Sequence, residues 1–127
     1  MATQPKKILI IEDDENLTYL LKEALKKESF AVLTAADGKE GLKIALEERP
    51  ALILLDIILP QLDGLTMLQQ LRANKKGVDI PVIILSNLSD AEEVSRAMES
   101  RAYDFLVKAD WNINDVVEKV KKRVERE

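Results

Sequence analysis

The residues of this chain that could do chemistry stand where apolar runs end. Asp56 follows Leu52–Leu55, and Glu12 and Asp13 follow Ile8–Ile11. A short unbroken apolar run is typical of a strand that is buried on both faces of a parallel sheet. The carboxyl ends of such strands share one edge, where open α/β sheets bind their ligands. We therefore expect the three carboxylates to lie close together.

Two further polar side chains end apolar runs of the same kind. Ser86 follows Pro81–Leu85, and Lys108 follows Tyr103–Val107. The same edge would then gather carboxylates, a hydroxyl and an ammonium group. Two carboxylates about 4 Å apart repel by about 4 kcal/mol at an effective dielectric constant near 20. Such a cluster must therefore bind a proton or a cation.

The composition restricts which cation and which reaction are available. The chain has no histidine and no cysteine, which excludes His-based catalysis, thiolate chemistry and zinc sites built on either residue. Oxygen ligands favour a hard ion, and two or three carboxylates that leave room for waters and phosphate oxygens favour Mg²⁺. Lys108 and the metal could neutralise a phosphoryl group, while Ser86 donates a hydrogen bond to it. Asp56 could then be the nucleophile that forms an aspartyl phosphate.

The elements that must position these residues alternate along the chain as strand and helix, five times over. This alternation predicts a parallel sheet with helices on both faces and right-handed crossovers. About 120 residues are too few for an eight-fold barrel, which needs about 250. The expected fold is therefore α/β, with a doubly wound five-stranded parallel sheet. The expected strands are Ile8–Ile11, Phe30–Ala35, Ala51–Asp56, Pro81–Leu85 and Tyr103–Val107.

The helices are predicted from apolar residues at helical spacing. Asp14 and Asn112 are expected to cap the first and last helices. The helix from about 90 to 101 has the weakest apolar stripe of the chain. The stripe of the first helix is Leu17, Leu20, Leu21, Ala24 and Leu25, and that of the fourth is Ala91, Val94, Ala97 and Met98.

Length and composition indicate one globular domain over residues 1–127. Hydrophobic residues make up 46% of the 127 and charged residues 33%, which is typical of a folded domain. No apolar run approaches the roughly 20 residues that span a bilayer, and residues 1–7 do not resemble a signal peptide. The lack of cysteine fits a cytoplasmic protein. A formal net charge of −4 argues against direct binding to nucleic acid or an anionic membrane.

The ordered set of motifs resembles the receiver domain of two-component response regulators, over essentially the whole chain and with no output domain after it. The resemblance implies a flavodoxin-like (βα)5 fold with strand order 2-1-3-4-5. The matching motifs are Glu12-Asp13 after the first strand, Asp56 followed by Pro60 and Asp63-Gly64, Ser86 after Ile80-Pro81, and Lys108.

The resemblance also implies roles for the residues at the edge of the sheet. Asp56 would accept a phosphoryl group from a sensor histidine kinase or a phosphotransfer protein. Glu12, Asp13, Asp56 and the backbone carbonyl of Ile58 would arrange Mg²⁺ and its waters. Lys108 would pair with Asp56 and then with the phosphoryl group. Such a domain is not an enzyme, because it assists only its own phosphorylation and dephosphorylation.

A conformational switch is part of the same resemblance. Ser86 would move toward the phosphate, and Phe105, by default a core aromatic, would be the aromatic switch residue. The surface of the fourth helix, fifth strand and fifth helix would respond and bind a downstream protein, or a second copy in a homodimer. The weak apolar stripe at 90–101 fits a mobile helix, because few buried contacts hold it.

The chain departs from the family pattern after its lysine. Ala109 follows Lys108 where a proline in a cis bond is usual. A cis bond before a non-proline residue costs roughly 2.5–4 kcal/mol. Either the bond is trans and the loop takes another route, or strain is stored there. Arg101 also stands where a glycine is common.

Three side chains near the expected site should set the rate of the phosphorylation cycle. Asn87 is larger than the residue usual after the serine, and we expect it to narrow access for the phosphodonor. Ile58 and Leu88 are apolar at the two positions that help or hinder the hydrolytic water. Slow autodephosphorylation is therefore expected.

Three other functions fit parts of this pattern. A pseudo-receiver that acts as an interaction module without phosphorylation is the main alternative, favoured by Ala109 and Asn87. A phosphatase of the haloacid dehalogenase type usually needs a second acid two residues after the nucleophile, where this chain has Ile58. A flavin-binding role lacks a Gly/Ser/Thr-rich phosphate loop after the first strand.

Overall fold

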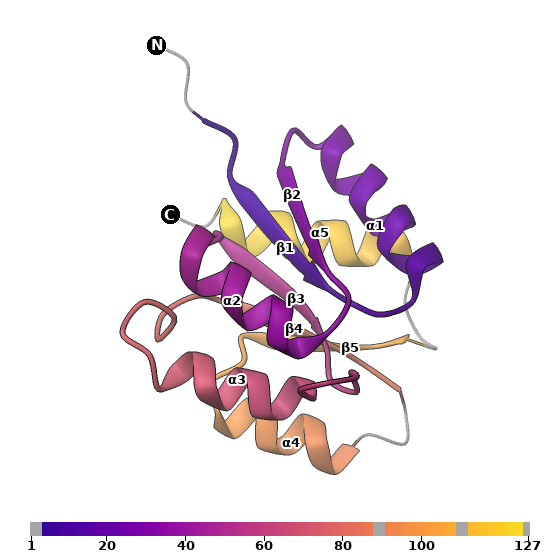
Figure 1. Ribbon diagram of the computed structural model, residues 1–127. Helices are drawn as coiled ribbons and strands as arrows, with labels where there is room; N and C mark the ends of the chain where they lie inside the picture. The colour runs from indigo at the N-terminus through magenta and orange to yellow at the C-terminus, as the bar shows by residue number, and fades with distance from the viewer. Residues whose placement is uncertain (1–3, 88–90, 109–111, 126–127) are drawn as a thin grey trace.

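The chain folds as five strands alternating with five helices in a computed structural model, which describes residues 4–87, 91–108 and 112–125 (Figure 1). The strands are Lys7–Ile11 (β1), Ala31–Ala35 (β2), Leu52–Asp56 (β3), Val82–Ser86 (β4) and Asp104–Val107 (β5). The helices are Glu15–Lys27 (α1), Gly38–Glu48 (α2), Gly64–Arg72 (α3), Ala91–Glu99 (α4) and Ile113–Val124 (α5).

All five strands are parallel and lie in the order β2-β1-β3-β4-β5. The chain starts in the middle of the sheet, adds β2 on one side, and then returns to build β3, β4 and β5 on the other. The order therefore reverses between β1 and β3, which is the place where a doubly wound sheet opens a crevice at its carboxyl edge. The predicted fold class and strand order are confirmed.

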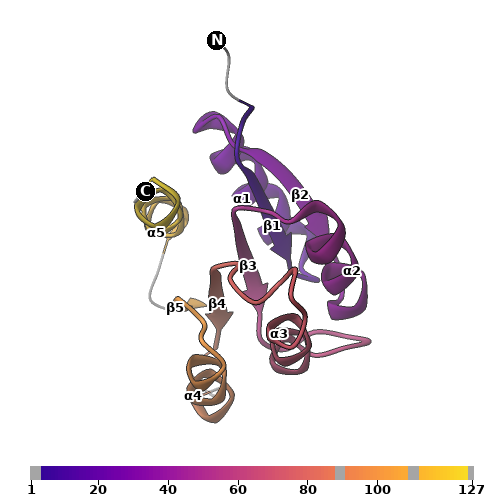
Figure 2. The same cartoon turned by 90° about the vertical axis from the view of Figure 1, so that its left-hand side faces the viewer.

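Each face of the sheet carries its own hydrophobic core. Alternate residues of a strand point to opposite faces, so Leu9 and Ile53 pack toward α2, α3 and α4, while Ile8 and Leu52 pack toward α1 and α5. Figure 2 shows α5 on one side of the strands and α2 and α3 on the other. Burial on both faces explains why β3 and β4 are unbroken apolar runs.

The predicted helix caps are confirmed. The Asp14 side chain accepts hydrogen bonds from the backbone N–H groups of Asn16 and Leu17 at the start of α1. Asn112 caps α5 through a reciprocal pair of hydrogen bonds with Asp115. These caps fix where each helix begins after its strand.

The apolar stripes of α1 and α4 are narrower than the sequence predicts. Leu20 was expected to face the core, but it lies at the margin of the stripe and is 51% exposed. In α4 only Val94 and Ala97 are buried, whereas Ala91 and Met98 are exposed. The expectation for these three residues was wrong because residues at the edge of a stripe are covered only where a neighbouring element reaches them.

No helix within residues 4–87, 91–108 and 112–125 is both long and apolar enough to cross a bilayer.

Candidate functional site

Three carboxylates meet at the carboxyl edge of the sheet, where β1 and β3 end. Asp56 is the last residue of β3, and Glu12 follows β1, where its backbone N–H donates to the carbonyl of Ala35 on β2. Glu12 is 3% exposed and Asp56 5%, whereas Asp13 is open to solvent. One oxygen from each of the three carboxylates lies within 4.8 Å of the other two. The structure thus brings together the acids that the sequence placed at one edge.

Lys108, after β5, reaches across β4 into this cluster. Its Nζ donates a 3.0 Å hydrogen bond to Asp56 Oδ2 and lies 3.0 Å from Glu12 Oε1. The remaining carboxylate oxygens are held by the backbone: the Ile58 N–H donates to Asp56 Oδ1, and the Asp14 N–H donates to Glu12 Oε2, both at 3.1 Å. Lys108 therefore joins the ends of β1, β3 and β5 at one point.

Buried Glu12 and partly buried Lys108 have perturbed pKa values. Burial, together with the neighbouring Asp56 carboxylate, raises the pKa of Glu12 from 4.5 to about 7, against the opposite effect of Lys108. Burial by itself lowers the pKa of Lys108, but contacts with Glu12 and Asp56 outweigh it, so this pKa lies above its ordinary value. The site holds more negative charge than one lysine can compensate.

The donor set fits a divalent hard cation. Glu12 Oε1 is buried and accepts no hydrogen bond from the described residues, although it lies near the Lys108 charge. With all three carboxylates ionised, as metal ligands must be, they and the one ammonium group leave an excess of two negative charges. All three candidate ligands offer oxygen, which suits Mg²⁺ better than a soft or nitrogen-preferring ion. Glu12, Asp13 and Asp56 are the side chains that could hold such an ion.

Gly64 positions the end of β3, a role that the sequence did not reveal beyond the turn at Asp63-Gly64. Its N–H donates a 3.0 Å hydrogen bond to the Ile57 carbonyl. A Cβ at position 64 would lie 2.4 Å from the carbonyl oxygen of Asp56 and 2.7 Å from the Cα of Ile57. Only glycine lets α3 begin this close to the backbone that carries Asp56. The one sequence signal for this is a glycine directly after the capping Asp63.

Ser86 ends β4 beside this cluster. Asp56 is in register with Leu85, the residue before Ser86, so the two site residues lie on adjacent strands. Ser86 is 1% exposed, and its hydroxyl donates a long hydrogen bond of 3.4 Å to the Leu106 carbonyl on β5. A bond of this length is weak, so the hydroxyl can leave it at little cost.

Phe105 is not a core aromatic, because its side chain is 40% exposed. It lines a groove of about 420 Å³ between α4 and β5. Ser86 and Met98 line the same groove. The groove thus connects the end of β4 with the exposed face of β5.

Some of the sequence-based expectations concern residues outside the described part of the chain. The Lys108–Ala109 bond and Leu88 are among them. Asn87 is described and is exposed at the end of β4; its effect on the phosphodonor stays a prediction. Arg101 has a φ of 65°, which explains why a glycine suits that position.

The fold and the residues at its carboxyl edge define a flavodoxin-like α/β protein with a lysine set among acidic oxygen ligands. The chain belongs to the response regulator receiver domain family, whose model matches residues 8–121. It is therefore a receiver domain of the two-component response regulator type.

Individual relatives agree with this assignment. The transcriptional regulatory protein PrrA of Mycobacterium tuberculosis is 37% identical over 125 residues, which cover 98% of this chain and 52% of PrrA. The receiver domain of the Francisella response regulator 1452 has a TM-score of 0.84 at 30% identity, covering 95% of this chain and 98% of that one. The phosphorylated cyanobacterial phytochrome response regulator RcpA has a TM-score of 0.80 at 27% identity, covering 93% and 92%. The chain spans about half the length of the curated relatives that it matches.

Proposed function

We propose that this receiver domain carries a signal by accepting a phosphoryl group on Asp56 from the phosphohistidine of a sensor kinase or a phosphotransfer protein. The observation that carries the proposal is the position of the Lys108 ammonium, 3.0 Å from oxygens of both Asp56 and Glu12. Together with the solvent-exposed Asp13, this arrangement combines a nucleophile, a fixed cation and carboxylate oxygens that can bind a metal ion. RcpA, a relative at 27% identity, is known in a phosphorylated form.

The transfer is an in-line displacement at phosphorus. A carboxylate oxygen of Asp56 forms a bond to phosphorus as the bond between phosphorus and the imidazole nitrogen breaks. The electron pair of that bond leaves with the imidazole, which then takes up a proton. Lys108 would follow the negative charge from the carboxylate to the phosphoryl oxygens, since its contact with Asp56 Oδ2 is lost when Asp56 becomes an acyl phosphate.

Mg²⁺ would be held by Glu12, Asp13, Asp56 and the backbone carbonyl of Ile58. When bound, it supplies positive charge that neutralises the phosphoryl oxygens in the transition state. The protein itself shields the Glu12 and Asp56 carboxylates from water and fixes their orientation. The N–H groups of Asp14 and Ile58 do this by holding one oxygen each.

Phosphorylation would be read out on the face formed by α4, β5 and α5. A phosphoryl oxygen near Asp56 offers Ser86 a better acceptor than the 3.4 Å contact with Leu106. Movement of Ser86 would change the shape of the groove that it lines together with Phe105 and Met98. We propose that a downstream protein, or a second copy of the domain, binds this face. The domain itself would catalyse nothing beyond its own phosphorylation and dephosphorylation.

Mg²⁺-dependent phosphorylation by acetyl phosphate tests the proposal. Intact mass spectrometry should show one added phosphoryl group on the wild type in Mg²⁺ and none in EDTA. Asp56→Asn should abolish it, and Asp13→Asn should slow it strongly. Asp79→Asn removes an exposed loop carboxylate outside the site and should leave labelling unchanged.

Failure of both acetyl phosphate and beryllofluoride to bind the folded wild type would refute phosphoacceptor function. That result would favour the pseudo-receiver, which binds partners without phosphorylation. Labelling that persists in Asp56→Asn would place the acceptor elsewhere.

A further inference from the structure

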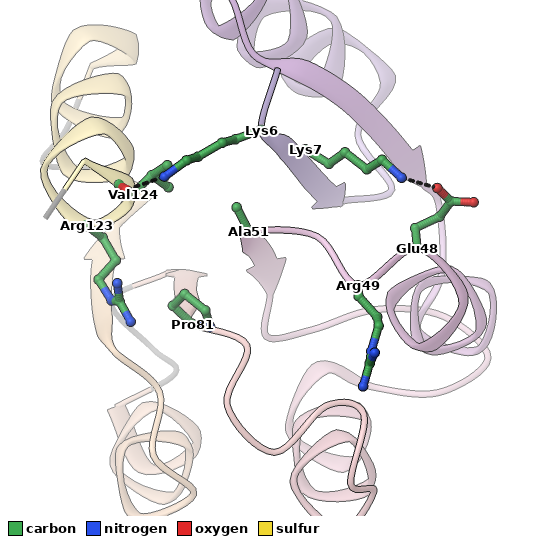
Figure 3. A pocket seen from close by; sticks show the side chains of 8 residues that line it. All are labelled: Lys6, Lys7, Glu48, Arg49, Ala51, Pro81, Arg123 and Val124. Atoms are coloured by element: carbon green, nitrogen blue, oxygen red, sulfur yellow. Dashed lines mark hydrogen bonds and ion pairs between the residues drawn. The ribbon is translucent and has the colours of Figure 1, made fainter. Parts of the chain in front are cut away.

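A second charged concavity lies at the opposite edge of the sheet, where the strands begin. It has a volume of about 460 Å³, and Lys6, Lys7, Arg49 and Arg123 bring four cationic side chains to it (Figure 3). They come from the start of β1, the end of α2 and the end of α5. We call these four residues, with Glu48 and the floor residues Ala51 and Pro81, the basic pocket.

The basic pocket is electropositive in a chain whose formal net charge is −4. Among the residues that the structure describes, Glu48 is the only acid that lines it, and it pairs with Lys7 at 2.8 Å. Within the described ranges 4–87, 91–108 and 112–125, no carboxylate pairs with Lys6, Arg49 or Arg123. In this described part of the chain, three positive charges at one place thus have no acidic partner.

Contacts with the rest of the protein hold these cations in position. Lys6 Nζ donates to the Val124 carbonyl at 3.1 Å, and the Arg123 guanidinium lies 5.4 Å from the centre of the Tyr103 ring. Arg49 ends α2 with a φ of 47°, a left-handed conformation that glycine or asparagine adopts more easily.

The shape of the pocket indicates the chemistry of its ligand. Arg49 and Arg123 stand on opposite sides of Ala51 and Pro81, which form an apolar floor between them (Figure 3). Guanidinium groups bind carboxylates with paired hydrogen bonds. The Tyr103 ring, which could stack on a nucleobase, already faces Arg123.

We propose that the basic pocket docks an acidic peptide segment of a partner protein, with an aliphatic side chain on Ala51 and Pro81 and carboxylates on Arg49 and Arg123. This goes beyond phosphoryl transfer, because the pocket lies at the other edge of the sheet from Asp56. A partner held here leaves the phosphoacceptor edge free, and it touches the α4-β5-α5 face only at the end of α5, where Arg123 lies. Docking should therefore be independent of the phosphorylation state.

NMR titration of the ¹⁵N-labelled domain tests the proposal. The probes are a short peptide of alternating glutamate and leucine, the same peptide with glutamine for glutamate, and tripolyphosphate. Only the acidic peptide should bind well, and it should shift the amide signals of Arg49, Ala51 and Arg123. Rim charges are each worth up to a few-fold in affinity. Arg49→Gln and Arg123→Gln should each raise its Kd about threefold, and the double variant about tenfold.

Lys39→Gln with Lys43→Gln is the matched control, because it removes two exposed charges of α2 outside the pocket. The control should change Kd less than about twofold. An equal loss in the control would show general charge attraction and overturn the proposal. Tighter binding of tripolyphosphate, signal shifts confined to the α4-β5-α5 face, or no binding of the acidic peptide at millimolar concentration would also overturn it. In Asp56→Asn the Kd should be unchanged, which separates this site from the phosphoacceptor.

Discussion

Lys108 Nζ donates a 3.0 Å hydrogen bond to Asp56 Oδ2, and this bond joins the chain after β5 to the end of β3 across the intervening strand β4. The two residues are 52 positions apart in the sequence. Because Glu12 Oε1 lies at the same 3.0 Å from the ammonium group, one cation holds the ends of three strands together. The candidate site should therefore also stabilise the fold, because it links these strand ends.

Lys108→Met should lower the free energy of unfolding by about 2 kcal/mol at pH 8. Breaking a buried ion pair costs about 3–5 kcal/mol, and the loss here is smaller because the Lys108 side chain is 23% exposed. Urea denaturation followed by circular dichroism measures it. Lys119→Met is the control: it breaks a surface pair with Asp104 and should cost less than about 1 kcal/mol. Equal losses of unfolding free energy in the two variants would show that the buried cluster stabilises the fold no more than a surface ion pair does.

The pKa of Glu12 predicts that the metal-free domain loses stability as pH rises from 4.5 to about 7. In this window the unfolded chain has an ionised Glu12 and the native state a protonated one. The native state therefore binds more protons, and the free energy of unfolding falls with pH. Below pH 4.5 the contribution is fully present, and above pH 7 it is gone. A pKa difference of this size corresponds to about 3 kcal/mol.

Glu12→Gln isolates this effect from the other acids, because glutamine cannot ionise. In EDTA, the stability of wild type relative to Glu12→Gln should fall between pH 4.5 and 7 and then level off. Glu47→Gln, an exposed acid on α2, should parallel the wild type at every pH. A flat difference between wild type and Glu12→Gln would contradict the raised pKa.

The sequence predicted the fold and the gathering of site residues because both depend on simple periodicity. Unbroken apolar runs indicate strands that are buried on both faces. The polar residue that ends each run lies at the carboxyl edge of the sheet, whatever the conformation of the loop that follows. For this reason Asp56, Glu12 and Lys108 could be brought together without coordinates. The Asp14 cap followed from local chemistry alone.

The exposure of individual side chains could not be predicted in the same way. Phe105, Leu20 and Met98 are apolar residues at periodic positions, and whether a neighbour covers each one depends on helix placement. The close packing of Gly64 against the Asp56 backbone depends on the distance between α3 and β3, which no local sequence pattern encodes. The raised pKa of Glu12 likewise depends on the depth of burial.

Arg72 should be a major contributor to the attachment of α4. Its guanidinium, at the end of α3, donates to the carbonyls of Gly77, Ser100 and Arg101 at 2.9, 3.2 and 3.0 Å. Arg72→Ala would leave these carbonyls without a charged donor; the bonds to Ser100 and Gly77 are partly buried and the bond to Arg101 is exposed. A hydrogen bond to a charged group is worth about 1.5–3 kcal/mol. With partial replacement by water, we expect a loss of about 2–3 kcal/mol in the free energy of unfolding.

Amide hydrogen exchange localises this effect. In Arg72→Ala, exchange should speed up most around 97–102, the end of α4 and the turn that follows. Arg96→Ala is the control. It removes an exposed arginine whose guanidinium lies 3.9 Å from a carboxylate oxygen of Glu92, and it should change the free energy of unfolding by less than about 0.5 kcal/mol. Uniformly faster exchange throughout the sheet would argue against a local clamp.

Ile58 should slow the loss of the phosphoryl group from Asp56. Its side chain is 51% exposed, only two residues from the nucleophile, and it offers a hydrolytic water no hydrogen bond. Ile58→Asn supplies one, and a hydrogen bond of about 1.4 kcal/mol made only in the transition state speeds hydrolysis about tenfold. Single-turnover decay of the acetyl phosphate-labelled domain measures the rate. Ile58→Val keeps the site apolar and should decay at the wild-type rate. Equal decay of all three proteins would show that this side chain does not control the water.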